Sequence, residues 1–189
     1  PGGYDQNILS SDAFRILILS RPGYLRTPLS VGQTAGEQAT AYSELLEVLG
    51  IQKVVVMGIS GGGPSSMEFA AKFPEKTLGL IAFEAVSYSE DYANKFPEDE
   101  SMLNGSDFSM WAGLYYMSFL GAKKKAAMML PNPKNRIRLT SNPKNVAKLK
   151  SMEWSIWPMS LRREGVANDY QQFVNLSIPF EKINAPTLA

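Results

Sequence analysis

A serine lies in a glycine-rich turn at residues 58–62, whose sequence is Gly-Ile-Ser-Gly-Gly. The pattern Gly-x-Ser-x-Gly between a buried strand and a helix is typical of a sharp turn that exposes the serine hydroxyl above a sheet. A valine-rich run precedes this turn and a segment of small residues follows it, so its surroundings match the pattern. We therefore predict that Ser60 is a nucleophile and that the Gly61 N–H stabilises a developing oxyanion. Gly58 and Gly62 are expected to keep the turn free of side-chain clashes.

The same turn could instead cradle a phosphate at the start of a helix. Phosphate-binding turns carry Gly-x-Gly-x-x-Gly, or a lysine followed by serine or threonine after the glycines. Residues 58–66 contain neither pattern. The sequence therefore favours a nucleophile over a phosphate site.

A serine hydroxyl is a poor nucleophile unless a base accepts its proton. Histidine is the commonest such base, and the chain contains none among its 189 residues. The same absence removes the commonest metal ligand. This sequence thus contains the serine but not the histidine base that it would need.

Composition excludes several classes of partner. The chain has no cysteine, which excludes disulfides and thiolate metal sites. The formal net charge of +1 gives no electrostatic reason to expect nucleic acid. The longest apolar runs are too short for stable membrane insertion, and no signal peptide is visible, which suggests a cytoplasmic protein. We predict a small-molecule substrate, no metal and no cofactor.

Three apolar runs are predicted to form buried strands, with helices between them. The strands are predicted over residues 14–20, 51–58 and 77–83. A capping-box pattern at Thr34 and Glu37 begins one helix that ends at Gly50, and a second helix is predicted over 64–73. This alternation predicts an α/β fold with a doubly wound, mostly parallel sheet and helices on both faces. A ligand site is then expected at the carboxyl ends of the strands, where Ser60 lies.

The pattern changes over residues 87–180, which hold all three tryptophans and seven of the nine methionines. Helices are predicted near residues 108–120, 122–130 and 142–152. Asn132-Pro133 and Asn142-Pro143 each indicate a helix start, with Asn as the N-cap and Pro in the first turn. Residues 183–189 are predicted to open a further strand.

Several of these stretches resemble the α/β-hydrolase-1 group, which includes esterases, proline iminopeptidases, haloperoxidase-like enzymes and hydrolases of carbon–carbon bonds. The resemblance is carried by PGGYDQ, SRPGYLRTPL, LLEVLGIQKVVVMGISGGGPSS, FAAKFPEK and INAPTL. It implies an α/β-hydrolase core over residues 1–86, an inserted helical cap over 87–180, and the start of the returning core strand over 181–189.

The resemblance also implies a serine hydrolase that cleaves an ester, amide or related acyl bond through an acyl-enzyme. The second oxyanion-hole N–H would come from the segment before PGG, with Gly3 at its edge, and the catalytic Asp and His would follow INAPTL. We therefore expect the chain to be an internal fragment of a longer hydrolase, with at most residual activity by itself. Two alternatives stay open: a non-catalytic ligand-binding module on the same fold, and a lyase or haloperoxidase-like enzyme.

Aromatic residues of the cap are candidates for the wall of a pocket that takes an apolar acyl group. Trp111 and Tyr115 are the cap residues proposed here, and they could equally hold the cap helices together. Arg21 and Tyr24, in the loop after the first predicted strand, could border the mouth of the site or anchor that loop.

Two carboxylates and a basic run have less specific interpretations. Glu84 follows the third predicted strand, where some members of the family place the catalytic acid, but a solvent-facing or cap-anchoring role is favoured. Asp169 is interpreted as a structural cap or turn residue. The run at 123–125 could touch an anionic membrane but more often such a run is a solvated face.

Overall fold

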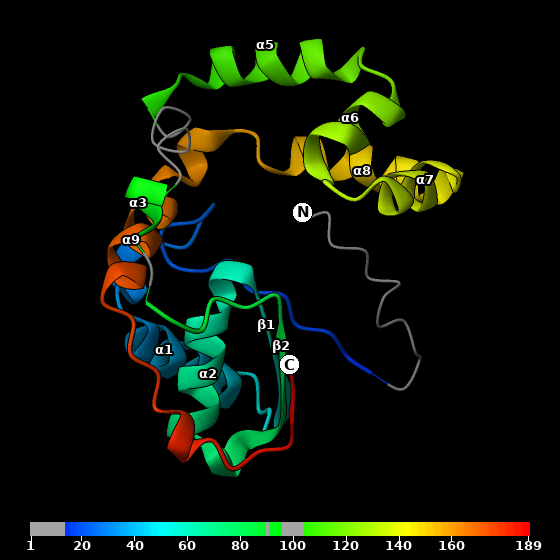
Figure 1. The fold of residues 1–189 in the computed structure, drawn as a ribbon. Coiled ribbons are helices and arrows are strands. Elements are labelled where there is room, and N and C mark those ends of the chain that lie inside the picture. The colour runs from blue at the N-terminus through cyan, green and yellow to red at the C-terminus, as the bar shows by residue number, and fades with distance from the viewer. Residues whose placement is uncertain (1–13, 90, 96–103) are drawn as a thin grey trace. The chain divides into compact units, whose positions relative to one another are not determined.

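The computed structural model describes residues 14–89, 91–95 and 104–189, and these fall into two compact units (Figure 1). The helical unit contains residues 14–19 and 104–160. The sheet unit contains the described residues from 20 to 95 together with 161–189. The predicted division into core, cap and returning strand stays a prediction.

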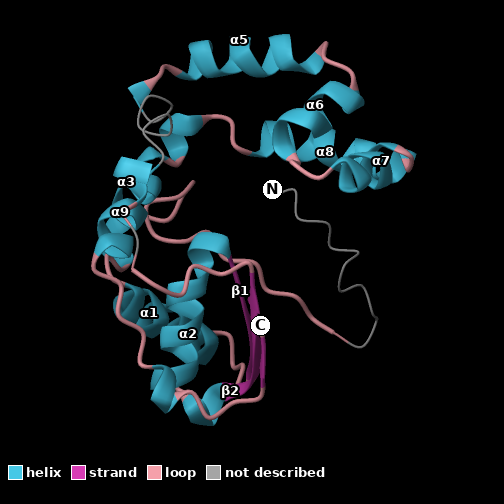
Figure 2. Cartoon of the chain, viewed as in Figure 1, coloured by secondary structure: helices cyan, strands magenta, loops and turns pink. Residues whose placement is uncertain are grey.

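The sheet unit is built on three parallel strands in the order β1–β2–β3 (Figure 2). The strands are β1 (Val54–Ile59), β2 (Thr77–Phe83) and β3 (Thr187–Leu188). The last residues of β1 and β2, Ile59 and Phe83, are partners in the register, so the two strands end side by side. The strand predicted over 77–83 is confirmed, the one predicted over 51–58 begins later, and the strand expected in INAPTL is short.

Helix α1 (Ala35–Val48) begins and ends as its sequence predicts. The side chain of Thr34 accepts a hydrogen bond from the Glu37 N–H, and Glu37 accepts in return from the Thr34 N–H. At the other end Gly50 adopts a φ of 68°, and its N–H bonds the Glu47 carbonyl at 3.0 Å. These local signals confirm the predicted helix because each depends only on residues a few positions apart.

Helix α2 (Gly63–Lys72) packs with α1 on one face of the sheet. Phe69 of α2 lies at the centre of this layer, 2% exposed, against Ala39 and Leu46 of α1. A second cluster joins α2 to β2; its buried members are Met67, Ala70, Leu80 and Ile178. Together these clusters hold the first residues of α2 close to the end of β1.

The opposite face of the sheet is exposed, which corrects the prediction of strands buried on both faces. Val55 is 56% exposed and Phe83 is 54% exposed. Helices α1 and α2 lie on the same face of the sheet (Figure 1), where Ala39 and Leu46 of α1 and Phe69 of α2 pack in one cluster with Val54 and Val56 of β1. These two helices therefore do not provide the predicted cover on both faces (Figure 1).

The strand predicted over residues 14–20 is wrong. These residues form no strand, and Phe14 and Ile18 are 70% and 57% exposed. An apolar run indicates burial, but a strand also needs a hydrogen-bonded neighbour, and none of the described residues pairs with this segment.

The helical unit is a series of helices, as predicted. They are α5 (Asp107–Ser118), α6 (Ala122–Met129), α7 (Pro133–Thr140) and α8 (Pro143–Ser155). Asn132 and Asn142 are N-caps whose side chains accept the Lys134 and Lys144 N–H groups at 2.9 Å, which confirms both predicted starts.

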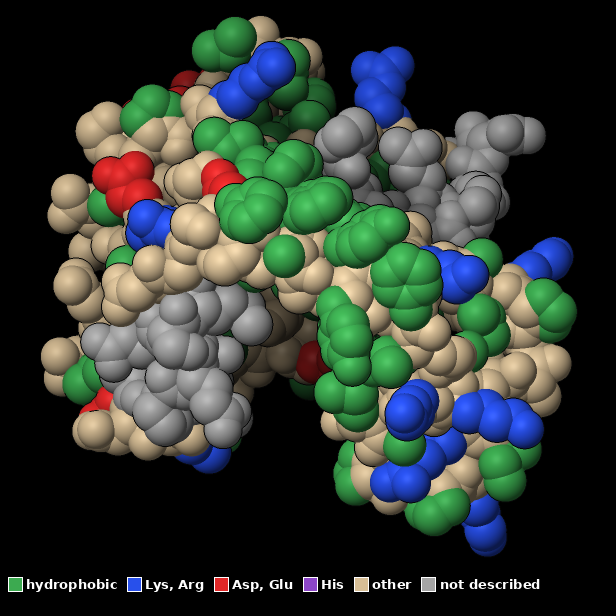
Figure 3. Space-filling view, turned by 90° about the horizontal axis from the view of Figure 1, so that it is seen from above, with side chains coloured by type: hydrophobic (Ala, Val, Ile, Leu, Met, Phe, Trp, Pro, Cys, Tyr) green, Lys and Arg blue, Asp and Glu red, His purple; other side chains and the backbone are tan. Residues whose placement is uncertain are grey.

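Charge in the helical unit is mostly basic, and blue Lys and Arg side chains gather over its surface in Figure 3. Lys125 differs from its neighbours in the basic run because it is only 2% exposed and its Nζ bonds Glu153 at 2.7 Å. No helix of the described residues is long and apolar enough to cross a membrane.

The remaining elements are short except for α9 (Arg163–Val174), which lies wholly within the range predicted as cap but belongs to the sheet unit. Helix α3 covers Tyr92–Lys95. The 3₁₀ helices are Leu29–Val31, Ser60–Gly62, Pro74–Lys76, Met159–Leu161 and Phe180–Lys182. Helix α9 contacts α3 within the sheet unit and supplies part of the site described next.

Candidate active site

Ser60 stands between β1 and α2 in a strained backbone conformation. Its φ is 49°, in the left-handed region that side-chain-bearing residues rarely adopt, and its side chain is exposed. Its carbonyl accepts a hydrogen bond from the Val86 N–H at 3.0 Å. The Ser66 hydroxyl bonds the Gly62 carbonyl at 2.9 Å in the same turn. Hydrogen bonds to Val86 and Ser66 thus hold the turn, while the Ser60 hydroxyl faces outward.

The glycines of this turn have unequal roles. A Cβ on Gly58 would lie 2.9 Å from the Ser66 side chain, so this glycine is needed for close approach, as expected. A Cβ on Gly62 would have no atom within 4 Å, so the prediction that Gly62 avoids a clash is wrong. The next residue, Gly63, has the tight contact instead, since a Cβ there would lie 2.7 Å from the Ala85 Cβ and the Val86 carbonyl oxygen.

This difference predicts unequal effects of two neighbouring substitutions on stability. Gly63→Ala should lower the free energy of unfolding by about 1–3 kcal/mol because backbone near Val86 must move. Gly62→Ala should change it by no more than about 0.5 kcal/mol. Urea titrations followed by circular dichroism measure both values, and equal losses in the two variants would contradict this description of the turn.

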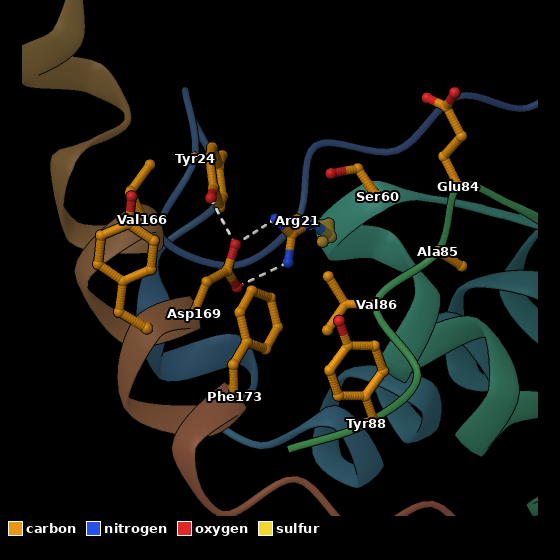
Figure 4. A pocket seen from close by; sticks show the side chains of 12 residues that line it. Arg21, Tyr24, Ser60, Glu84, Ala85, Val86, Tyr88, Val166, Asp169 and Phe173 are labelled. Carbon is orange, nitrogen blue, oxygen red and sulfur yellow. Dashed lines mark hydrogen bonds and ion pairs between the residues drawn. The ribbon is translucent and has the colours of Figure 1, made fainter. Parts of the chain in front are cut away.

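An open pocket of about 510 Å³ lies in front of Ser60, entirely within the sheet unit (Figure 4). Its lining residues come from the loop after residue 20, the end of β1, the segment after β2, and α9. They are Arg21, Tyr24, Ser60, Gly61, Glu84, Ala85, Val86, Tyr88, Val166, Asp169, Tyr170 and Phe173. Ser60 and Gly61 therefore share one pocket with Tyr24.

Two residues predicted to line the pocket, Trp111 and Tyr115, are not among its described lining residues. Trp111 and Tyr115 lie on α5 in the helical unit, where their rings stack with centroids 5.3 Å apart. That Trp111 and Tyr115 take part in substrate binding stays a prediction. Gly3, the expected edge of the oxyanion hole, lies outside the described residues.

One wall of the pocket is a partly buried ion pair between Arg21 and Asp169. Both guanidinium Nη atoms donate to the two oxygens of Asp169, with Nη1 at 2.7 Å from Oδ1, and the Tyr24 hydroxyl donates to Oδ2 at 2.6 Å. Asp169 is 5% exposed and lies inside α9, so its prediction as a cap or turn residue is wrong. The helical spacing of Val166, Tyr170 and Phe173 could have indicated this helix.

Close backbone contacts hold the loop of Arg21 and Tyr24 against α9. The Gly165 N–H bonds the Gly23 carbonyl at 3.0 Å, and the Leu25 N–H bonds the Leu161 carbonyl at 2.5 Å. A Cβ on Gly165 would lie 2.2 Å from the Tyr24 ring, so only glycine fits there. The two roles considered for Arg21 and Tyr24 therefore coexist: they anchor the loop and they border the pocket.

Burial and pairing shift the ionisation of this wall. Burial alone would lower the pKa of Arg21, but the hydrogen bonds and charge of Asp169 outweigh it, so this pKa lies above its ordinary value. Burial, reinforced by the Asp169 carboxylate, raises the pKa of Tyr24 well above that of a free tyrosine. Arg21 stays charged and Tyr24 stays a neutral donor at physiological pH.

The raised pKa of Tyr24 predicts a loss of stability in alkali. The unfolded chain releases the tyrosine proton at about pH 10, whereas the folded chain retains it, so the contribution of Tyr24 to stability is complete below that pH and declines above it. Tyr24→Phe should make the decline shallower by up to about 1.4 kcal/mol for each pH unit. Urea unfolding at a series of alkaline pH values measures the slope. Tyr116→Phe, at an exposed tyrosine of α5, is the matched control, and equal slopes in all three proteins would contradict the assignment.

Glu84 lies beside Ser60 at the same edge of the sheet. It directly follows Phe83, the register partner of Ile59, just as Ser60 directly follows Ile59. Its φ is 46°, so both residues have left-handed backbones. Glu84 is exposed, as the favoured interpretation of the sequence expected, but it also lines the pocket.

In the described part of the chain, no group of three or more acidic side chains is placed so that it could hold a metal ion. The polar groups of the pocket include the Ser60 hydroxyl, the hydroxyls of three tyrosines, a paired arginine and aspartate, and one further carboxylate.

Comparison with known proteins relates this chain to a family. The chain is 38% identical over 79 residues to the uncharacterized hydrolase YcgS of Bacillus subtilis, which is 42% of this chain and 28% of that protein. It is 35% identical over 63 residues to homoserine O-acetyltransferase of Thermus thermophilus, which is 33% of this chain and 17% of that protein. The matches thus span well under half of these curated relatives.

A solved structure shares the fold over most of the chain. An alpha/beta hydrolase fold protein from Nakamurella multipartita superposes with a TM-score of 0.68 and 28% sequence identity, covering 89% of this chain and 61% of that one. The model of the alpha/beta hydrolase fold family matches residues 6–174. The chain belongs to the α/β-hydrolase fold family.

Proposed function

We propose that the protein containing this chain is a serine hydrolase that cleaves an ester, amide or related acyl bond. The observation that carries the proposal is the position of Ser60, which is exposed in a pocket, at a strand–helix turn, with a left-handed backbone. Such a turn lifts the hydroxyl above the sheet and leaves room for a substrate carbonyl. The similarity to proteins named hydrolase and acetyltransferase agrees with chemistry on acyl groups.

In the proposed reaction the Ser60 oxygen attacks the carbonyl carbon of the substrate. Its proton passes to a base and then to the leaving group, which departs as an alcohol or amine when the carbon–oxygen or carbon–nitrogen bond breaks. The Gly61 N–H stabilises the oxyanion, together with a second N–H that we expect near Gly3. Water then cleaves the acyl-enzyme, releases a carboxylic acid and restores the hydroxyl.

The base in this proposal lies outside the 189 residues, because they include no histidine. We therefore expect the chain by itself to hydrolyse p-nitrophenyl acetate at no more than a residual rate that comes from binding and the oxyanion hole. Full turnover by this chain, lost in Ser60→Ala, would contradict a histidine-dependent mechanism.

The acyl-enzyme can be tested in the protein that contains this chain, called the longer protein below, by rapid mixing with p-nitrophenyl acetate. An initial burst of p-nitrophenol, in an amount close to that of the enzyme, is expected because acylation releases this product before water attacks. A burst would also argue against the lyase, haloperoxidase-like and non-catalytic alternatives. Steady release with no burst under conditions of slow deacylation would contradict the acyl-enzyme.

Acyl transfer to an alcohol is the second candidate function, favoured by the similarity to a homoserine O-acetyltransferase. It shares the acyl-enzyme and differs only in the acceptor. An added alcohol acceptor should then increase turnover and divert the acyl group into a new ester, which mass spectrometry detects. If acid is the sole product at every alcohol concentration, the protein is a hydrolase.

A further inference from the structure

The charges that line the pocket do not balance. Arg21 and Asp169 are bound to each other through both Nη atoms and both carboxylate oxygens. Glu84 is the remaining charged residue of the lining, and no described residue forms a hydrogen bond or ion pair with its carboxylate. One positive and two negative groups give the pocket a net charge of −1. A bound positive charge would neutralise this excess.

Aromatic rings make up much of the remaining wall. They belong to Tyr24, Tyr88, Tyr170 and Phe173. The faces of such rings attract cations, and one of them already does so, since the Arg21 Cζ lies 4.7 Å from the centre of the Tyr24 ring. The wall thus combines a carboxylate with surfaces that accept both apolar groups and cations.

The position of Glu84 limits where a bound cation would lie. Ser60 and Glu84 follow paired residues of neighbouring strands, and such strands are about 4.8 Å apart. The Glu84 side chain extends from the same edge of the sheet as that of Ser60 (Figure 4). A cation bound by Glu84 would therefore lie a few covalent bonds from a carbonyl held at Ser60.

We propose that this site takes acyl compounds with a protonated amine a few bonds from the scissile carbonyl, and that Glu84 binds the amine. The proposal rests on the proposed function of Ser60 and names the substrate class for it. The aromatic rings hold the apolar part of the acyl group, and the Arg21–Asp169 pair contributes no net charge.

A matched pair of substrates tests the proposal in the longer protein. The β-alanyl and butanoyl esters of p-nitrophenol have acyl groups of the same shape, but only the first carries an ammonium group. We expect Glu84→Gln to lower the ratio of kcat/KM for the β-alanyl ester to that for the butanoyl ester by about five- to tenfold. Glu75→Gln, which removes an exposed carboxylate outside the pocket, should leave this ratio unchanged.

A second measurement does not depend on turnover of the cationic ester. n-Butylammonium should inhibit hydrolysis of the butanoyl ester competitively, and Glu84→Gln should raise its inhibition constant by a similar factor. Unchanged discrimination and unchanged inhibition in Glu84→Gln would overturn the proposal. So would an equal loss for both esters, because Glu84 would then act in the reaction and not in recognition.

Ser60→Ala separates the failure of this proposal from that of the proposed function. If this variant is inactive while Glu84→Gln keeps the wild-type discrimination, only the substrate class is wrong. If Ser60→Ala hydrolyses both esters at the wild-type rate, the proposed function fails, and the role of Glu84 fails with it.

Discussion

Replacing Ser60 with alanine should lower kcat of the longer protein towards its ester substrates by a factor of about 10⁴–10⁶. The reason is that the variant lacks the atom that forms the acyl-enzyme, while the pocket and the Gly61 N–H remain. Steady-state kinetics with active-site concentration determined by titration measures the loss. A variant that retains a tenth or more of wild-type kcat would show that the reaction does not pass through Ser60.

Ser60→Gly is the matched control for this loss. It removes the same hydroxyl, so its activity should match that of Ser60→Ala. Its free energy of unfolding should be higher than that of Ser60→Ala by about 1 kcal/mol, because glycine adopts a φ of 49° without strain. Equal inactivity with unequal stability would separate the chemistry of the hydroxyl from the conformation of the turn.

Replacing Asp169 with asparagine should lower the free energy of unfolding by about 3–5 kcal/mol. The substitution keeps the shape of the side chain but leaves the guanidinium of Arg21 partly buried without its counter-ion. It also weakens the hydrogen bond from Tyr24, so the loop should detach from α9 more easily. Urea unfolding followed by circular dichroism measures the change.

Two further variants show whether pairing causes this effect. Glu47→Gln removes an ion pair between Lys76 and a glutamate side chain that is 67% exposed. It should lower the free energy of unfolding by less than about 1 kcal/mol. The double variant Arg21→Leu with Asp169→Leu removes both charges and should be more stable than Asp169→Asn. If Asp169→Asn and Glu47→Gln cost the same, the pair between Arg21 and Asp169 is not a buried determinant of stability.

Features encoded by neighbouring residues were predicted correctly from the sequence. The capping box of α1, the glycine after it, and the Asn-Pro starts of α7 and α8 all have the predicted contacts. The strand–turn–helix around Ser60 belongs to the same class, since its pattern fits within residues 54–72. Each of these features is stabilised by hydrogen bonds that span only a few positions, which a sequence motif can represent.

Features that depend on distant residues were missed or wrong. Arg21 and Asp169 are separated by 148 positions, and no local pattern relates them. The apolar run at 14–20 has the composition of a strand, but the partner that a strand requires is not a property of that run. The tight contact was predicted at Gly62 but lies at Gly63. A local pattern could not show this, because the contact is with residues 85 and 86 after β2.

The identity of the nucleophile is tested most directly by a fluorophosphonate, which forms a stable bond with an activated serine. The longer protein, treated with such a probe and digested with trypsin, should carry one phosphonyl group on the peptide of residues 54–72. Fragmentation of this peptide should locate the group on Ser60 rather than on Ser65 or Ser66, which are buried. An unlabelled protein, or a label on any other residue, would contradict the assignment of Ser60 as the nucleophile.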